Sequence, residues 1–457
     1  MPGKNVHESI LDCIGDTPLV RLHKVVDGCR TPVWAKCEFM NPGSSVKDRI
    51  GLAIIEDAER AGKIRPGGTI VEATSGNTGI GLAIAASIKG YRTVFTIPDK
   101  MSMEKVRLLK AFGAQVIVTP TVDPSHPDYY VTVAKNIVHA TPNSYLANQF
   151  YNQVNPNVHY ASTGPELWEQ TEGKIDVLVG GLGTGGTMSG AGKFLKEKKP
   201  SCRIVGADPL GSVFKAYKET GQLIKGSVYK VEGIGQDKIP STTWLDYIDE
   251  FREVNDKDAF AMARRLVREE GIFVGGSSGL AAKVAIDIAK ELDDPTKMVV
   301  VILTDTGERY LSKFHSDEWM RENRFLDEPA ADVRHLLMQK PASAKPLVSI
   351  GSKMTVKQAL DIMGRENVSQ VPVLDNGESV GSCSEAQLMS LVLDRKAKFE
   401  TPVAEVMETP FPVVGGNESI EYIGKLLARD NSALLVRTEK DITGILTRYD
   451  VIQSMAR

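Results

Sequence analysis

One lysine stands where a helix is predicted to begin. Residues 41–49 read Asn-Pro-Gly-Ser-Ser-Val-Lys-Asp-Arg, and the turn-forming residues end just before Lys47. Beyond Lys47, apolar residues recur at helical spacing, at Ile50, Ala53, Ile54 and Ala58. An amine at a helix start lies beside the positive end of the helix dipole, which disfavours its protonated form. Lys47 is therefore a candidate Schiff-base nucleophile.

A short polar loop follows the predicted strand Thr69–Ala73 and opens another helix. It reads Thr-Ser-Gly-Asn-Thr-Gly over residues 74–79. Backbone amides and small hydroxyls at a helix start form an anion site, suited here to a substrate α-carboxylate, while the Asn77 carboxamide can hydrogen-bond a ring oxygen. Together with Lys47 this loop suggests a pyridoxal phosphate enzyme. The alternative is a capped helix that binds no ligand.

A glycine-rich run follows the apolar strand predicted at Asp176–Val179. Residues 180–187 read Gly-Gly-Leu-Gly-Thr-Gly-Gly-Thr. Glycines allow the backbone to approach a phosphate closely, with amides and hydroxyls as donors. We expect the phosphate contacts at Gly183, Thr184, Gly185, Gly186 and Thr187. Taken alone, the run also fits a dinucleotide turn or a flexible connection.

A third strand-to-helix turn, Gly-Gly-Ser-Ser-Gly over residues 275–279, places Ser277 where its hydroxyl can face a ring nitrogen. A neutral hydroxyl partner leaves a pyridine nitrogen unprotonated, which makes the ring a weaker electron sink and favours β-elimination and replacement over transamination. A plain helix N-cap is the alternative interpretation.

The elements that position these loops alternate between strand and helix from about residue 32 to residue 303. Predicted strands include Val33–Phe39, Arg92–Ile97, Gln115–Val118 and Arg203–Asp208, with amphipathic stretches between them. This alternation predicts an α/β fold with a mostly parallel sheet covered on both faces.

A second region begins after a charged, irregular stretch near residues 314–334. Residues 333–338 resemble residues 402–407, at an offset of about 63 to 69 residues between copies. Each copy predicts a βαββα unit, with helices at Val356–Gly364 and Ile420–Arg429. We expect a catalytic domain over 1–320, a linker over 321–333, and regulatory modules over 334–396 and 397–457.

Composition narrows the class of protein. The chain has 457 residues, 42% hydrophobic and 25% charged, with a formal net charge of -3. These values fit a globular protein and give no electrostatic reason to expect nucleic acid or an anionic membrane as partner. No apolar run approaches the roughly 18 residues that span a bilayer, so we expect a cytoplasmic protein with small-molecule substrates. The five cysteines and seven histidines are scattered, so we expect neither a disulfide framework nor a structural metal.

These motifs, in this order, resemble the fold-type II pyridoxal phosphate enzymes, and within them the cystathionine β-synthase family. The resemblance covers most of the chain. It identifies residues 41–49 with the cofactor-lysine segment, 74–78 with the substrate loop, 183–187 with the phosphate loop, and Ser277 with the pyridine-nitrogen partner. Gln149 resembles a further contact to the substrate carboxylate. Gly233, in the run Glu-Gly-Ile-Gly over residues 232–235, belongs to a loop that closes over the substrate.

The resemblance implies a β-replacement that condenses L-serine with L-homocysteine to give L-cystathionine and water. The serine carboxylate would lie on Thr74, Ser75, Thr78 and Gln149, and the freed Lys47 would act as base. A thiol such as cysteine or sulfide in place of homocysteine would make hydrogen sulfide chemistry accessible. The nearest rival is a cysteine synthase that uses O-acetylserine and sulfide. A serine or threonine dehydratase fits less well, and a non-catalytic adenosyl-ligand sensor is disfavoured because Lys47 is present.

The chain also departs from the animal members of that family. The pattern Ile-Gly-Asp-Thr-Pro-Leu at residues 14–19 comes almost at once, so we expect no haem, and no Cys-x-x-Cys pair is present. Phe150 and Gln236 stand where tyrosines are usual, which leaves second-substrate handling open. In the second regulatory copy, Thr447 and Asp450 match a ribose-binding pattern for an adenosyl ligand such as S-adenosylmethionine. The first copy lacks that acid, and the pair could instead serve only dimer contacts in a homodimer or homotetramer.

Overall fold

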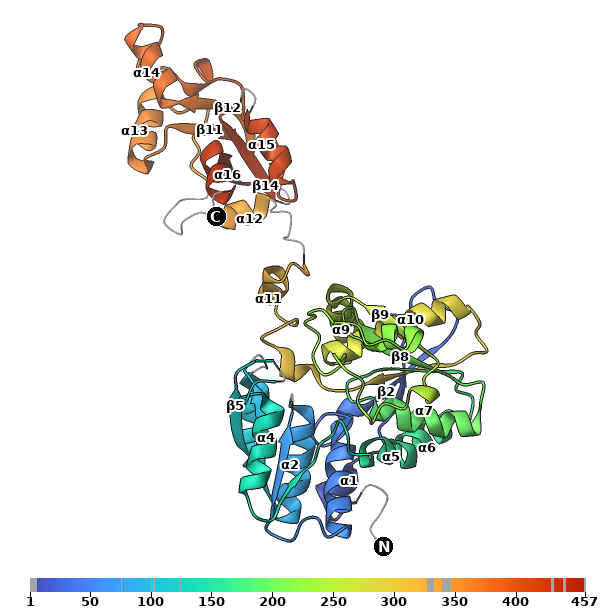
Figure 1. The fold of residues 1–457 in the computed structure, drawn as a ribbon. Helices are drawn as coiled ribbons and strands as arrows, with labels where there is room; N and C mark the ends of the chain where they lie inside the picture. The colour runs from blue at the N-terminus through green and yellow to red at the C-terminus, as the bar shows by residue number, and fades with distance from the viewer. Residues whose placement is uncertain are drawn as a thin grey trace. The chain divides into compact units, whose positions relative to one another are not determined.

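The computed structural model describes residues 6–74, 76–99, 101, 103–123, 125–326, 333–338, 347–428, 431–438 and 441–455. The chain divides into two compact units, Met1–Leu326 and Asp327–Arg457. Each unit contains its own packed cores, and each is described by itself (Figure 1).

The first unit contains two sheets. The larger sheet has the strand order β1-β2-β10-β7-β8-β9, and all neighbours are parallel except β1 and β2. Its strands are β1 (Leu19–Arg21), β2 (Val33–Cys37), β7 (Val177–Gly181), β8 (Arg203–Pro209), β9 (Glu250–Val254) and β10 (Val299–Leu303). The smaller sheet has the order β5-β4-β3-β6, all parallel, formed by β3 (Thr69–Ala73), β4 (Arg92–Pro98), β5 (Gln115–Thr119) and β6 (Ser144–Leu146).

Helices cover both sheets. Figure 1 shows α1 (Lys47–Arg60), α2 (Asn77–Lys89) and α4 (Tyr130–Ala140) beside the smaller sheet. The remaining helices of this unit are α3 (Met103–Ala111), α5 (Val154–Ala161), α6 (Thr163–Gln170), α7 (Gly186–Lys198), α8 (Phe214–Thr220), α9 (Asp256–Glu270), α10 (Gly276–Leu292) and α11 (Asp317–Glu322), with a short 3₁₀ turn, η4 (Gly307–Tyr310). The predicted α/β class with parallel sheets is confirmed.

Two strand ends predicted for the first unit are wrong by two residues. The strand expected to end at Val179 continues to Gly181. The strand expected at Val33–Phe39 ends at Cys37, and a 3₁₀ turn, η2 (Glu38–Met40), follows it. The reason is a buried charge: the Glu38 carboxylate accepts hydrogen bonds from Arg49 Nε at 2.8 Å and from Thr17 Oγ1 at 2.7 Å. The chain turns at Glu38 to make these contacts, and the turn leads toward Lys47.

The order of the strands brings the predicted loops together. The loop before α1 lies beyond β2, Thr74 and Gly76 lie between β3 and α2, and the glycine-rich run comprises the last two residues of β7 and the turn into α7. A bridge between Ser45 and Asp305 ties the segment before α1 to the chain just after β10. In parallel α/β sheets, ligands bind at the carboxyl ends of the strands, and all these segments lie at such ends.

The second unit contains two similar copies. The first has α13 (Val356–Glu366), β11 (Gln370–Asp375), β12 (Glu378–Ser384) and α14 (Glu385–Leu393). The second has β13 (Val413–Gly415), α15 (Ile420–Ala428), β14 (Ala433–Thr438), β15 (Asp441–Thr447) and α16 (Arg448–Met455). Both antiparallel strand pairs carry a register shift at the same place, after Val373 and after Val436.

The segments that precede the two copies are exchanged. In α12 (Val333–Met338), Val333 and Leu336 pack into the core of the second copy, and Val333 N donates to Glu418 O at 3.2 Å. In the equivalent later segment, Val403 packs into the core of the first copy, where Val403 N donates to Met354 O at 2.7 Å. Each copy is therefore completed by residues that stand before the other copy in sequence.

Candidate functional site

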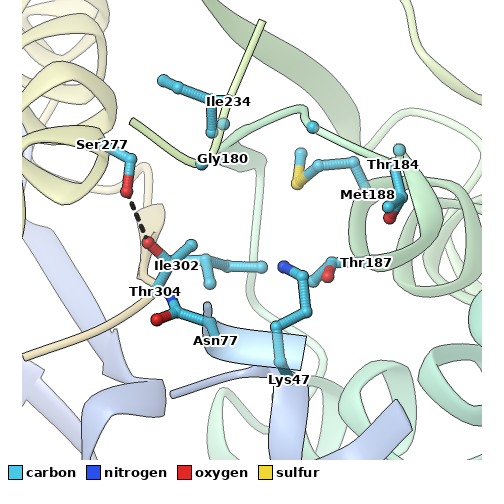
Figure 2. Close-up of a pocket in the computed structure, with 14 residues that line it drawn as sticks. Lys47, Asn77, Gly180, Thr184, Thr187, Met188, Ile234, Ser277, Ile302 and Thr304 are labelled. Carbon is cyan, nitrogen blue, oxygen red and sulfur yellow. Dashed lines mark hydrogen bonds between the residues drawn. The ribbon is translucent and has the colours of Figure 1, made fainter. Parts of the chain in front are cut away.

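Lys47 begins α1 and points into a pocket lined by β7 and β10 of the larger sheet, by α2, α7 and α10, and by neighbouring loops (Figure 2). Its backbone N–H donates to Ser45 Oγ at 3.3 Å, so the serine before it fixes the helix start. Burial lowers the pKa of the Lys47 amine, and the nearby Asp305 and Glu38 carboxylates oppose that effect. Loss of solvation is a larger effect than the two carboxylates, and it favours a neutral, nucleophilic amine.

The pocket collects most of the predicted cofactor residues. Lys47, Asn77, Gly183, Thr184, Gly185, Thr187, Gly233 and Ser277 line it, together with Gly180, Gly181, Met188, Ile234, Ile302 and Thr304. Gly186 is the first residue of α7 and lies next to this lining. Thr74, Thr78 and Gln149 are outside the lining, and Ser75 lies outside the described residues.

The glycine-rich run packs too closely for side chains. A Cβ on Gly183 would lie 2.5 Å from Gly233 O, and a Cβ on Gly185 would lie 2.1 Å from Thr243 Oγ1. Gly185 also has a φ of 80°, in the left-handed region that glycine tolerates. The run can therefore form a backbone cradle at the start of α7. Such a cradle, with hydroxyls at Thr184 and Thr187 beside it, fits a phosphate group.

Sequence reasoning missed His159, which holds one hydroxyl of this cradle. Its Nε2 lies 3.1 Å from Thr187 Oγ1, and its Nδ1 lies 2.8 Å from Thr163 Oγ1. Burial, reinforced by the positive charge of Arg49, lowers the pKa of His159 to about 3, so the ring is neutral. His159 stands alone in sequence in α5, and no local pattern indicated its role.

Ser277 lies at the opposite side of the pocket. Its Oγ is 2.8 Å from Thr304 Oγ1, which Figure 2 shows as a dashed line. Thr304 follows β10 directly and was not singled out from the sequence. The two hydroxyls form a neutral pair, without a carboxylate in hydrogen-bond contact with Ser277 among the described residues.

Asn77 begins α2 and is held on both sides. Its Nδ2 donates to Asp305 Oδ2 at 2.8 Å, and Arg309 Nη1 donates to its Oδ1. Asp305 also accepts a hydrogen bond from the Tyr310 hydroxyl at 2.7 Å. The sequence offered one signal for these partners: Thr-Asp-Thr-Gly at residues 304–307 comes straight after a buried strand, where functional residues gather in α/β folds.

The residues expected to bind a substrate carboxylate meet beside α2. Thr78 Oγ1 donates to Gln149 Oε1 at 2.6 Å, and Gly76 N donates to Thr74 Oγ1 at 3.0 Å. Glu72, buried in β3, accepts from the backbone N–H groups of Asn148 at 2.6 Å and Gln149 at 3.3 Å. The buried Glu72 carboxyl thus holds the turn that presents Gln149 to Thr78.

The loop of residues 232–235 is fastened by charge. Glu232 accepts hydrogen bonds from Lys105 Nζ at 2.5 Å and from Lys313 Nζ. Burial opposes ionisation of Glu232, but the two ammonium groups prevail and lower its pKa. The neighbouring Gly233 lines the pocket, so this ion cluster fixes one wall of the site.

In the second unit, Thr447 and Asp450 contact one another at the start of α16. The Thr447 backbone N–H and its Oγ1 donate to Asp450 Oδ2, at 2.7 and 2.9 Å. In the first copy, Ser384 caps α14 by accepting from Gln387 N at 3.2 Å. The position that Asp450 occupies in α16 is therefore held by the uncharged Gln387 in α14.

The described residues show neither a disulfide nor a cluster of metal-ligating side chains. All five cysteines are free, and the described residues contain no group of three or more His, Cys, Asp or Glu side chains placed to hold a metal ion. Among the helices that the structure describes, none combines the length and the apolar character that a membrane crossing requires.

Comparison with known proteins identifies the class. Residues 10–305 match the family described as "Pyridoxal-phosphate dependent enzyme", and residues 329–394 and 403–457 match the CBS domain. The chain is 40% identical to the cystathionine beta-synthase of Oryctolagus cuniculus, over 98% of this chain and 84% of that one. It is 39% identical to the cystathionine beta-synthase of Dictyostelium discoideum, over 98% of this chain and 92% of that one.

Solved structures agree with this result. The O-acetylserine dependent cystathionine beta-synthase from Helicobacter pylori is 35% identical with a TM-score of 0.63, and the match covers 68% of this chain and 99% of that one. A hydrogen sulfide-producing enzyme from Fusobacterium nucleatum is 37% identical with a TM-score of 0.63, covering 67% and 100%.

The fold and the site therefore define a pyridoxal-phosphate dependent enzyme that carries a C-terminal pair of CBS domains. More narrowly, the chain belongs to the cystathionine β-synthase family, as its similarity to relatives over nearly its whole length shows.

Proposed function

We propose that this chain condenses L-serine with L-homocysteine to give L-cystathionine and water. The observation that carries the proposal is the convergence of a half-buried lysine, a glycine cradle and a neutral hydroxyl pair in one pocket. The pocket contains the side chains that a β-replacement would use. The chain also resembles cystathionine β-synthases over nearly its whole length.

The residues fit pyridoxal phosphate in distinct roles. The cradle of residues 183–187 would hold the phosphate, Ser277 would face the ring nitrogen, Asn77 would face the ring oxygen, and Lys47 would bind the aldehyde carbon. Bound pyridoxal phosphate supplies an electron-accepting ring that stabilises the carbanion formed when an amino acid loses its α-proton. The neutral pair of Ser277 and Thr304 would give the ring nitrogen an uncharged partner, which would favour replacement at Cβ.

The chain's own groups then bind and move protons. Thr74, Ser75, Thr78 and Gln149 would hold the serine carboxylate, and the loop with Gly233 would cover the substrate. The neutral Lys47 amine takes the serine α-proton, and the β-hydroxyl leaves with a proton as water. The homocysteine sulfur forms a bond to Cβ and loses its thiol proton. That proton replaces the one that the departing hydroxyl took up to leave as water. The Lys47 ammonium returns the proton to Cα.

We also propose a regulatory ligand site, an oligomeric state and a cellular location. Thr447 and Asp450 would hold the ribose of an adenosyl ligand such as S-adenosylmethionine in the second CBS copy. We propose an enzyme without haem, assembled as a homodimer or homotetramer and located in the cytoplasm, with neither nucleic acid nor membrane as partner. A role as a non-catalytic sensor is disfavoured because Lys47 lies in the pocket.

A second candidate reaction uses O-acetylserine. Its support is the Helicobacter pylori relative, whose name states dependence on that substrate. With homocysteine as acceptor the product would again be cystathionine, whereas with sulfide the enzyme would act as a cysteine synthase. Acetate is a better leaving group than hydroxide, so the same pocket could serve either donor.

Product analysis separates these reactions. The purified, cofactor-loaded protein would be offered serine with homocysteine, O-acetylserine with homocysteine, and O-acetylserine with sulfide, each at matched concentrations. We expect kcat/KM for the serine reaction to exceed the others by at least tenfold, about 1.4 kcal/mol in transition-state preference. Faster use of O-acetylserine would establish the second candidate instead, and the preferred acceptor would show whether it forms cystathionine or cysteine.

A further inference from the structure

The Asn77 carboxamide has a fixed orientation. A carboxamide can usually rotate by half a turn and exchange its oxygen and nitrogen, so its role as donor or acceptor is open. Here the Asp305 carboxylate can only accept and the Arg309 guanidinium can only donate. Nδ2 must therefore face Asp305, at 2.8 Å, and Oδ1 must face Arg309.

Both partners are held in place by further contacts. Asp305 is 1% exposed, and the Tyr310 hydroxyl donates to the same Oδ2 atom that receives Asn77. Arg309 is 4% exposed, and its Nη2 donates to the carbonyl of Gly43, in the loop that leads to Lys47. One short segment after β10 thus joins the loop before Lys47 to the start of α2.

We propose that Asp305 and Arg309 are positioning residues that make Asn77 face the cofactor's ring oxygen only as a hydrogen-bond donor. Asn77 lines the pocket, and its Nδ2 carries two hydrogens. Asp305 takes one, which leaves the second for the pocket. The Oδ1 atom accepts from Arg309, so Nδ2 is the atom of the carboxamide that would face the ring. This inference rests on the proposed function, because Asn77 needs a cofactor ring to act on.

The orientation has a spectroscopic consequence. A hydrogen bond donated to the ring oxygen stabilises its deprotonated form over its protonated form. The two forms of the bound cofactor absorb at different wavelengths, so the ratio of their bands in the substrate-free enzyme reports how well Asn77 donates. This ratio is independent of turnover.

The test uses the full-length, cofactor-loaded protein and its variants. Arg309→Gln releases Oδ1 and allows the carboxamide to rotate, so we expect the ratio of deprotonated to protonated bands to fall at least twofold, with weaker cofactor binding in fluorescence titration. Arg252→Gln is the matched control, because Arg252 pairs with Glu291 at the molecular surface and should leave both readouts unchanged.

A double variant distinguishes positioning from a general structural effect. If Arg309 acts through Asn77, then Arg309→Gln should change the band ratio no further in an Asn77→Ala background. An equal change in both backgrounds would overturn the proposal, as would an unchanged ratio in Arg309→Gln alone. Arg309→Lys is the second variant if Arg309→Gln does not fold. A lysine keeps the charge but cannot reach Gly43 and Asn77 together, so a wild-type ratio there would also overturn it.

Different outcomes would overturn the proposed function and the positioning role. A wild-type protein that binds no pyridoxal phosphate would overturn the proposed function itself. A wild-type protein that binds it normally while Arg309→Gln leaves the band ratio unchanged would overturn only the positioning role.

Discussion

At the scale of single residues, burial rather than local sequence sets the chemistry of Lys47. The amine loses solvation in the pocket, which lowers its pKa. The Asp305 and Glu38 carboxylates raise the pKa and so offset part of that decrease. An amine base must be neutral before it removes a proton, yet basic enough to hold it afterwards. The balance of desolvation and two carboxylates suits Lys47 to both steps.

Removal of this amine gives the first prediction. Lys47→Ala should lose the absorbance of the lysine-bound cofactor and lower kcat by about 10²–10⁴-fold or more, because nucleophile and base are lost together. Absorbance spectra and steady-state assays measure both. Lys63→Ala, an exposed lysine just after α1, is the control and should resemble the wild type. Unchanged turnover in Lys47→Ala would contradict the assignment.

His159 gives a prediction about pH. Its pKa is about 3 in the fold, whereas the ordinary value is 6.5. Between these two pH values His159 is therefore protonated in the unfolded chain and neutral in the folded chain. The stability that His159 contributes is present above pH 6.5 and is lost as the pH falls toward 3, by up to about 1.4 kcal/mol per pH unit.

The stability measurement must separate the contribution of His159 from those of other titrating groups. Burial raises the pKa of Glu72 and of Asp48 to about 7, and these carboxyls change stability with pH in the opposite direction. Urea unfolding of the wild type and His159→Gln should therefore be compared at pH 7, 6 and 5. The stability difference, wild type minus variant, should shrink as the pH falls. A difference that is constant with pH would show that His159 binds protons equally in the folded and unfolded chains, and so that its pKa is not lowered in the fold.

At the scale of elements, the loop of residues 232–235 is held by an ion cluster. Glu232 joins it to Lys105 of α3 and to Lys313 beyond η4. Lys105 also touches the loop that carries Asn77, since a Cβ on Gly76 would lie 2.7 Å from Lys105 Cδ. One ion cluster therefore links two walls of the site.

Loss of the Glu232 carboxylate should affect both stability and binding. Glu232→Ala leaves two neighbouring ammonium groups without their shared acid, so we expect a loss of about 3–5 kcal/mol in the free energy of unfolding. We also expect a higher KM as the loop loses its attachment. Glu291→Ala, which breaks a surface pair with Arg252, should cost no more than about 1 kcal/mol. Equal losses of unfolding free energy in the two variants would show that the buried cluster stabilises the fold no more than a surface ion pair does.

At the scale of the whole molecule, the chain combines a catalytic unit with a pair of modules that complete one another. The exchange of α12 and the segment around Val403 means that neither CBS copy has a full core without the other. The two copies should therefore fold as one body. Only the second has an acid at the third residue of its last helix, Asp450, where the first has Gln387.

This asymmetry predicts one adenosyl site per chain. In calorimetric titration of the full-length protein with S-adenosylmethionine, Asp450→Ala should weaken binding at least tenfold, about 1.4 kcal/mol, because a ribose loses its acceptor. Glu385→Ala, at the equivalent part of the first copy, should bind as the wild type does. Two equivalent sites, or unchanged affinity in Asp450→Ala, would contradict this assignment.

The sequence by itself determined the α/β class, the paired C-terminal modules and the loops that carry Lys47, Asn77, the glycine cradle and Ser277. These features follow from local rules: helix starts, turn glycines and the periodicity of apolar residues act over a few neighbouring positions. Only the tertiary structure decided which distant groups hold those loops. Asn77 meets Asp305 across 228 positions, Lys105 meets Glu232 across 127, and Thr187 meets His159 across 28. Such pairs depend on the order of strands in the two sheets, and a lone histidine, arginine or aspartate has no local pattern that indicates its partner.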